Sequence, residues 1–201
     1  MSSLPWTAPP GTTALIFDCD GTLADTMPIH FKAWTAMLGR HGFAFPETRF
    51  YELGGVPTKQ IIRILSTEQG VPIGDLDAMV DEKEAIFLTM IDQIQPVPAV
   101  YDIGRDHRHV YPMAVASGGY RAVVERTLKF IGVDEWFHAI VCAEDTARHK
   151  PEPDVFLEAA KRMGKRPEGC VVFEDTDIGL EAARRAGMHG VDVRGWYAKR
   201  G

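Results

Sequence analysis

Residues 14–22 of this chain, ALIFDCDGT, place two aspartates and a glycine directly after a short apolar run. The apolar residues lack clean alternation, which is typical of a parallel strand that is buried on both faces. Two carboxylates at the end of such a strand, Asp18 and Asp20, repel each other, so the pair indicates a bound cation or a shared proton. A calcium-binding EF-hand loop does not fit, because Thr22 and Ile29 would then occupy ligand positions.

Further apolar runs rich in Val, Ile, Phe and Ala predict strands at residues 111–117, 139–145, 170–175 and 189–193. Helical periodicity between the later runs predicts helices at residues 121–131, 155–163 and 178–186. Strand and helix in alternation predict an α/β fold with a doubly wound parallel sheet and right-handed crossovers. If the sheet begins at its centre, the strand at 170–175 can lie beside the strand at 14–18.

The connection between the first two predicted strands is far too long for one crossover, since it runs for about ninety residues where a dozen or more suffice. Its periodicity predicts helices over residues 26–42, 58–70 and 76–94. We therefore expect a core of residues 1–27 and 96–201 and an inserted helical domain of residues 28–95, with prolines at both boundaries. Such an insert would cover the edge where open α/β sheets bind ligands, so we interpret it as a cap, with a purely stabilising appendage as the alternative.

The composition is that of an ordinary globular protein, with 201 residues, 45% hydrophobic and 25% charged. A net charge of −6 argues against a general nucleic-acid or membrane-surface binder. The odd count of three cysteines without a CxxC pair fits a reducing compartment. We expect no signal peptide, because the first residues lack a basic start and a long apolar stretch, and no membrane span, because no apolar run approaches about 18 residues. We expect a cytoplasmic protein that binds neither nucleic acid nor membrane, and a monomer, because this architecture needs no partner to close its site.

Polar residues follow three of the other predicted strands. Glu174-Asp175 offer hard oxygen ligands suited to magnesium. Ser117-Gly118-Gly119 precede a helix, where backbone N–H groups approach an anion. Lys150 offers an ammonium for phosphate oxygens. Taken singly, Ser117 is also explained as a helix cap, Lys150 as a surface lysine and the acidic pair as a loop. Their shared position at carboxyl strand ends favours one site for a metal and a phosphate.

These segments resemble the four signature motifs of the haloacid dehalogenase superfamily, in the same order: Asp18-x-Asp20-Gly21-Thr22, Ser117, Lys150-Pro151 and Glu174-Asp175-x-x-x-Gly179. The resemblance covers nearly the whole chain. It is greatest to the branch that contains β-phosphoglucomutase and small sugar-phosphate phosphatases, whose pattern into the cap is similar to Asp25-Thr26, His30 and Trp34. It implies a Rossmann-like core, a helical cap and a magnesium-dependent phosphohydrolase.

The resemblance also implies residue roles. Asp18 attacks phosphorus and becomes an aspartyl phosphate, and Asp20 acts as general acid and then general base. Magnesium is held by the carboxylates of Asp18 and Asp175 and by the main-chain carbonyl of Asp20, with Glu174 in support. The residues expected to contact substrate are Ser117, Gly118 and Lys150 in the core and His30, Trp34 and Thr58 in the cap. For His30 and Trp34, packing in the core of the cap is the alternative.

A phosphosugar mutase is the main alternative to a phosphatase. Mutases of this branch carry a Lys-Gly-x-x-Arg pattern in a cap loop, where basic residues grip a second phosphate. The aligned stretch here, Gly54–Thr58, lacks both basic residues, although Lys59 and Arg63 lie nearby. Water is then the default acceptor, and a small substrate such as the hexose monophosphate fructose 1-phosphate is expected.

Other reactions of the superfamily fit less well. Dehalogenases do not need the second aspartate, and Asp20 is present. Phosphonatases use a cap lysine as a Schiff base, and nothing marks Lys32 or Lys59 as desolvated. A non-catalytic binding protein on the same scaffold would be indicated by loss of Asp18, Asp20 or Asp175, and all three are retained.

Overall fold

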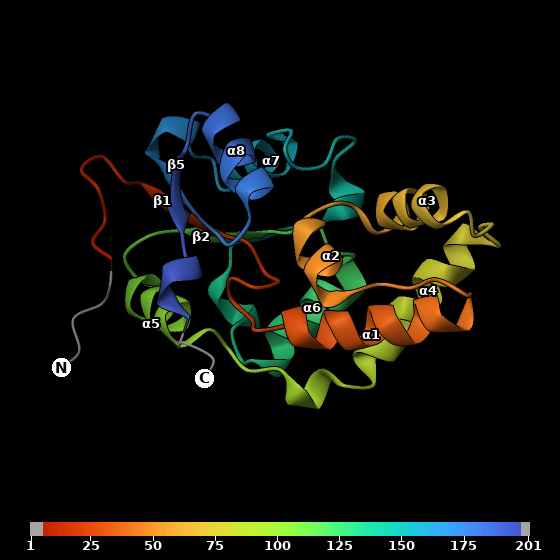
Figure 1. Cartoon of the computed structure of the whole chain (residues 1–201). Helices are drawn as coiled ribbons and strands as arrows, with labels where there is room; N and C mark the ends of the chain where they lie inside the picture. The colour runs from red at the N-terminus through yellow and green to blue at the C-terminus, as the bar shows by residue number, and fades with distance from the viewer. Residues whose placement is uncertain (1–5, 198–201) are drawn as a thin grey trace. The chain divides into compact units, whose positions relative to one another are not determined.

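The computed structural model describes residues 6–197, and the residues at either end lie outside the described part. The chain divides into two compact units. The larger contains the residues up to Asp25 together with those from Gln95 onward, and the smaller is Thr26–Ile94. The boundaries expected from the sequence, 28 and 95, fall close to these positions. Figure 1 shows how the chain leaves the first strand, forms the helices of the smaller unit and then returns to the sheet.

The larger unit is built on a five-stranded sheet of order β3-β2-β1-β4-β5, in which every pairing is parallel. The strands are β1 Ala14–Phe17, β2 Met113–Ala116, β3 Ala139–Val141, β4 Cys170–Glu174 and β5 His189–Asp192. The central strand β1 pairs with β2 on one side and with β4 on the other. The expected fold class is confirmed, and the first and fourth strands are neighbours.

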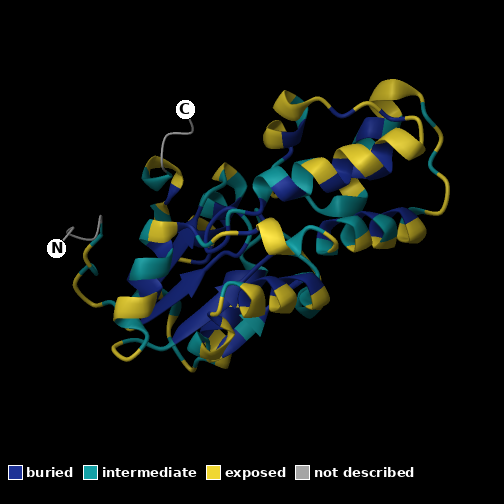
Figure 2. Cartoon of the chain, turned by 90° about the horizontal axis from the view of Figure 1, so that it is seen from below, coloured by how far each residue is buried: buried dark blue, intermediate teal, exposed yellow. Residues whose placement is uncertain are grey.

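Helices supply the apolar side chains that cover both faces of this sheet. They are α5 Pro98–His107, α6 Arg121–Phe130, α7 Asp154–Arg162 and α8 Asp177–Arg185. Alternate residues of β1 belong to different clusters. Ala14 and Ile16 pack with Phe156 of α7, whereas Leu15 and Phe17 pack with residues of α5 and α6. Both faces of the central strands are therefore buried, as Figure 2 shows in dark blue, which explains their lack of alternation in the sequence.

Two features of the larger unit differ from the expectation. Helix α5 was not predicted, although it completes the crossover from the inserted residues to β2, because only three of its ten residues are buried and charged residues fill its last turn. Strand β5 was expected to be buried on both faces, but His189, Gly190 and Asp192 are exposed. As an edge strand it pairs with β4 alone.

The smaller unit is entirely helical, with α1 Met27–Arg40, α2 Glu47–Glu52, α3 Thr58–Gln69 and α4 Leu76–Leu88. Helices α1 and α4 pack along each other, and Trp34 of α1 meets Phe45 edge to face at 5.7 Å. The short α2 was not predicted. The helix expected over 76–94 ends at Leu88 and is followed by a 3-10 turn at Ile91–Gln93. Within residues 6–197 no helix has the length and apolar character needed to cross a membrane.

Candidate active site

The carboxyl ends of β1 and β4 bring two of the acidic segments together. Phe17 and Phe173 are register partners, and their rings stack at 4.7 Å. Asp18, the next residue, donates its N–H to the carbonyl of Phe173 at 3.0 Å. Glu174 ends β4 and Asp175 follows it. The sheet itself therefore joins the first and fourth sequence motifs.

Lys150 connects these strand ends from a third segment. Its Nζ donates to Oδ1 of Asp18 at 2.7 Å and to Oε1 of Glu174 at 2.6 Å. The residue is only 8% exposed, so the surface-lysine interpretation is wrong. Burial lowers the pKa of Lys150, but the charges of Asp18 and Glu174 outweigh it and the net direction is upward. Lys150 is therefore a fixed positive charge between two carboxylates.

Negative charge nevertheless exceeds positive charge at this edge of the sheet. Burial raises the pKa of Asp18 to about 7, and Lys150 opposes this shift while Glu174 reinforces it. Burial, with the charges of Asp18 and Glu174, raises the pKa of Asp175 well above its ordinary value. A single ammonium does not neutralise these neighbouring carboxylates, so the site favours a further cation.

Magnesium fits this donor set. Asp18 and Asp175 supply hard oxygens, and Thr22 orients Asp175 by donating its hydroxyl to Oδ1 at 3.3 Å. In residues 6–197 no three His, Cys, Asp or Glu side chains converge as a metal cage. An ion held here would need main-chain or water oxygens as well, which is usual for magnesium.

Glu174 has a different environment from the one expected for a residue that supports the metal. Its Oε1 accepts from Lys150, and its Oε2 accepts from the N–H and the hydroxyl of Thr176 at 2.7 and 2.9 Å. Glu174 is 1% exposed. These contacts orient Lys150, which in turn holds Asp18, so Glu174 acts on the site through the lysine.

The segment after β2 places the Ser117 hydroxyl near the carboxylate of Asp20, which follows β1. Ser117 is buried, and its Oγ accepts from the N–H of Gly119 at 3.0 Å. The residue that precedes α6 is Tyr120, so the interpretation of Ser117 as a helix cap is wrong. A Cβ on Gly119 would lie 3.3 Å from Ser117 Oγ and 3.3 Å from Asp20 Oδ2. Because Gly119 has no side chain, the space beside the Ser117 hydroxyl and the Asp20 carboxylate stays open.

The first turn of α6 is less available to an anion than expected. The N–H of Arg121 donates to both carboxylate oxygens of Glu144, at 3.0 and 3.2 Å. A protein carboxylate thus occupies one of the helix-terminal N–H groups. Recognition of an anion here depends on the residues before the helix, Ser117-Gly118-Gly119, of which Gly118 is exposed.

Two glycines leave room for the acidic side chains. A Cβ on Gly21, whose φ is +81°, would lie 2.2 Å from Oδ2 of Asp175. A Cβ on Gly179, in the first turn of α8, would lie 1.9 Å from Oε1 of Glu174. The glycine of the fourth sequence motif is therefore required by the close approach of the Glu174 carboxylate.

We expect Gly179→Ala to lower the free energy of unfolding by about 2–3 kcal/mol, because the added methyl group overlaps the Glu174 carboxylate. Turnover should fall as well, since Glu174 is displaced from Lys150. Urea denaturation and steady-state kinetics measure the two effects. Gly39→Ala in α1, where a Cβ meets nothing within 4 Å, is the control and should be neutral or stabilising. Equal stability of both variants would contradict the steric argument.

The predicted substrate residues of the smaller unit lie in different settings. His30 stacks on Phe87 at 4.1 Å, and its Nδ1 lies 3.0 Å from Nζ of Lys83. Trp34 is 3% exposed and packs in the core of this unit. Thr58 begins α3 and is partly buried.

Lys83 is a buried cation that the sequence did not reveal. It is 3% exposed, pairs with Glu84 at 3.0 Å and lies 5.6 Å from the ring centre of Trp34. Lys83 stands in the charged run Asp81–Glu84, which is typical of a solvated helix face, so its burial could not be predicted from the sequence. The lysines considered for a Schiff base make exposed contacts instead, Lys32 with Gln93 and Lys59 with Asp77.

Comparisons with known proteins agree on one family. The family model described as haloacid dehalogenase-like hydrolase matches residues 15–193. Fructose-1-phosphate phosphatase YqaB of Escherichia coli K12 is 44% identical over 184 residues, which cover 90% of this chain and 95% of that protein. Beta-phosphoglucomutase of Bacillus subtilis is 27% identical over 189 residues, covering 90% of this chain and 82% of that protein.

Comparison with solved structures also finds similar proteins. CbbY from Rhodobacter sphaeroides in complex with phosphate superposes with a TM-score of 0.83 at 25% identity, over 94% of this chain and 89% of that one. The family inferred from the sequence motifs is confirmed. With its match to the family model over nearly its full length, this chain belongs to the haloacid dehalogenase-like hydrolases.

Proposed function

We propose that this protein is a magnesium-dependent phosphatase that hydrolyses a small sugar monophosphate, of the fructose 1-phosphate type, through a phosphorylated Asp18. The observation that carries the proposal is the buried Lys150 that bridges Asp18 and Glu174 at the carboxyl edge of the sheet. The 44% identity to a fructose-1-phosphate phosphatase over nearly its whole length supports the substrate class.

In this proposal, residues of the larger unit have separate roles in the reaction. Lys150 holds the Asp18 carboxylate in one orientation for attack on phosphorus, and with Ser117 and the N–H of Gly118 it binds the phosphoryl oxygens. Asp20 protonates the leaving sugar oxygen and then accepts a proton from the water that cleaves the aspartyl phosphate. General acid–base catalysis of this kind contributes about 10²–10⁴-fold.

Magnesium would be held by the carboxylates of Asp18 and Asp175 and the main-chain carbonyl of Asp20. When bound, it neutralises the charge that otherwise opposes approach of a carboxylate to a phosphate dianion. Burial, reinforced by the charges of neighbouring carboxylates, raises the pKa of both Asp18 and Asp175, so a bound cation would favour the ionised form of these two side chains.

We assign the unit Thr26–Ile94 the role of a cap that shields the reaction from bulk water. Of the side chains considered for a second-phosphate clamp, Arg63 is exposed and Lys59 pairs with Asp77 at 2.5 Å. This favours water over a sugar phosphate as acceptor, and hence hydrolysis over mutase activity. The free cysteines, Cys19, Cys142 and Cys170, support a cytoplasmic location.

A screen of phosphorylated sugars with magnesium tests the proposal. We expect phosphate release from fructose 1-phosphate and from p-nitrophenyl phosphate, and a loss of about 100-fold or more when EDTA removes the metal. β-Glucose 1-phosphate with a trace of glucose 1,6-bisphosphate should yield phosphate and not glucose 6-phosphate. Faster formation of glucose 6-phosphate would establish a mutase, and phosphate binding without turnover of any ester would establish a binding protein.

A further inference from the structure

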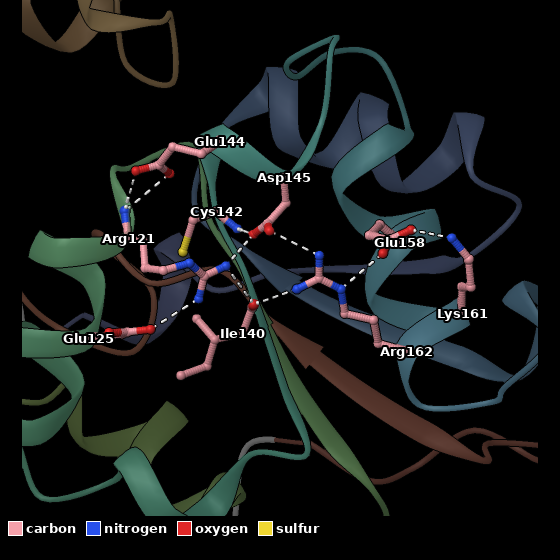
Figure 3. A network of polar contacts seen from close by, with 9 residues as sticks. All are labelled: Arg121, Glu125, Ile140, Cys142, Glu144, Asp145, Glu158, Lys161 and Arg162. Carbon is pink, nitrogen blue, oxygen red and sulfur yellow. Dashed lines mark hydrogen bonds and ion pairs between the residues drawn. The ribbon is translucent and has the colours of Figure 1, made fainter.

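A second polar cluster lies where β3 ends, outside the residues assigned above (Figure 3). Asp145 is its centre. Its Oδ2 accepts from Arg121 Nη2 and from the N–H of Cys142 (2.7 Å), and its Oδ1 accepts from Arg162 Nη2 at 2.9 Å. Both arginines also donate to the carbonyl of Ile140, at 3.3 and 3.1 Å. One carboxylate thus holds together β3, α6 and α7.

This cluster is joined to the segment that carries Ser117. The N–H of Ala143 donates to the carbonyl of Gly119 at 3.0 Å. Arg121, two residues after Gly119, is fixed by its side chain on Asp145 and by its N–H on Glu144. The segment from Ser117 to Arg121 is therefore held at Gly119 and at Arg121 by the turn that follows β3.

The position of Gly119 decides where the Ser117 hydroxyl points, because Oγ accepts from the Gly119 N–H at 3.0 Å. A shift of the turn after β3 would be passed to this hydroxyl through the carbonyl of Gly119. Misplacement of a binding group by about 1 Å costs about 100-fold in rate. The same turn leads on to Lys150, five residues after Asp145.

Charge makes Asp145 necessary to this arrangement. The guanidinium groups of Arg121 and Arg162 share the Ile140 carbonyl, and Asp145 is the carboxylate that bonds to both. Burial raises the pKa of Asp145. The hydrogen bonds from the Cys142 N–H and from Arg162 lower it by more, so the net direction is downward. Arg121 and Arg162 each have a second carboxylate partner, Glu125 and Glu158. Asp145 differs from these two because it pairs with both arginines, so its loss removes the carboxylate that joins α6 to α7 at this point.

We propose that Asp145 is a positioning residue for phosphate recognition, which acts by fixing the segment that carries Ser117. The proposal rests on the phosphatase function proposed above. Asp145 lies outside each of the sequence motifs that indicated the site, and it acts on the Ser117 segment through Arg121 and through the turn that contains Cys142 and Ala143.

The test combines Asp145→Ala with a matched control. Glu181→Ala removes another carboxylate that accepts from two arginines, Arg184 and Arg185, on the exposed face of α8. We expect Asp145→Ala to raise KM for p-nitrophenyl phosphate and the inhibition constant of inorganic phosphate by about 10- to 100-fold, with a smaller fall in kcat. Glu181→Ala should stay within about twofold of the wild-type enzyme.

A double-mutant cycle separates positioning from general structure. In a Ser117→Ala background the effect of Asp145→Ala should shrink to less than about threefold, because the group that it positions is gone. Asp145→Asn, which keeps an acceptor for the Cys142 N–H, should recover part of the phosphate affinity. If circular dichroism shows that the Asp145→Ala variant does not fold, Asp145→Asn takes its place in these comparisons.

The proposal is overturned if Asp145→Ala changes phosphate affinity by the same factor with and without Ser117, or if it leaves KM and phosphate inhibition unchanged. Absence of turnover by the wild-type protein would count against the proposed function alone. Calorimetric titration with inorganic phosphate would still compare the variants in that case.

Discussion

Asp18→Asn should lower kcat by about 10⁴-fold or more and leave the protein folded. The asparagine amide cannot form the acyl phosphate, yet its oxygen still accepts a hydrogen bond from Lys150 in place of Asp18 Oδ1. Because the change removes one of several crowded negative charges, the free energy of unfolding should stay the same or rise. Release of phosphate from p-nitrophenyl phosphate and a thermal melt measure the two quantities.

The exposed aspartate Asp134 provides the control for this experiment. Asp134→Asn should retain full activity, since the residue lies on the surface of the larger unit. An Asp18→Asn enzyme with more than about 1% of wild-type turnover would show that another group attacks phosphorus.

Lys150→Met should damage both catalysis and stability. The variant leaves Asp18 and Glu174 buried without their shared cation, and breaking a buried ion pair by removing one partner costs about 3–5 kcal/mol. Turnover should fall because the phosphoryl oxygens lose a charge partner and Asp18 loses its orientation. Chemical denaturation in parallel with kinetics measures both losses.

Lys161→Met is the matched control, because Lys161 pairs with Glu158 on the exposed surface of α7. Its removal should change the free energy of unfolding by less than about 1 kcal/mol. If Lys150→Met were as stable and active as Lys161→Met, the bridge between Asp18 and Glu174 would not organise the site.

Much of the fold and of the site could be predicted because strand ends in a parallel sheet meet at one edge. The apolar runs at Ala14–Phe17 and Cys170–Glu174 each end in carboxylates, and a sheet that begins at its centre places these runs side by side. The chemistry of Asp18, Lys150 and Asp175 then follows from residue type and position. The positions of these strand ends could be predicted from local sequence, because each strand is a short apolar run followed by polar residues.

What could not be predicted depends on contacts between distant segments. The burial of Lys83 depends on Trp34, which approaches it only when α1 packs on α4. The contact of Glu174 with Lys150 likewise appears only once β4 and the Lys150 segment are assembled. In the sequence, Lys83 is indistinguishable from a lysine on a solvated helix face.

The cluster around Asp145 was missed for a related reason. Glu144 and Asp145 close the apolar run at 139–145, where they have the appearance of a polar strand end. Their partners Arg121 and Arg162 come from two different helices, at separations no local pattern links. Positioning residues outside the reacting centre therefore require coordinates.

The central claim, attack by Asp18 on phosphorus, is tested most directly by trapping the phosphorylated enzyme. The protein is mixed with magnesium and fructose 1-phosphate carrying a radiolabelled phosphate, quenched in acid within one turnover and digested. The account predicts label on the peptide that contains Asp18, released by hydroxylamine as an acyl phosphate is, and none in the Asp18→Asn protein. Hydrolysis without any label on the wild-type enzyme, or equal label on both proteins, would contradict it.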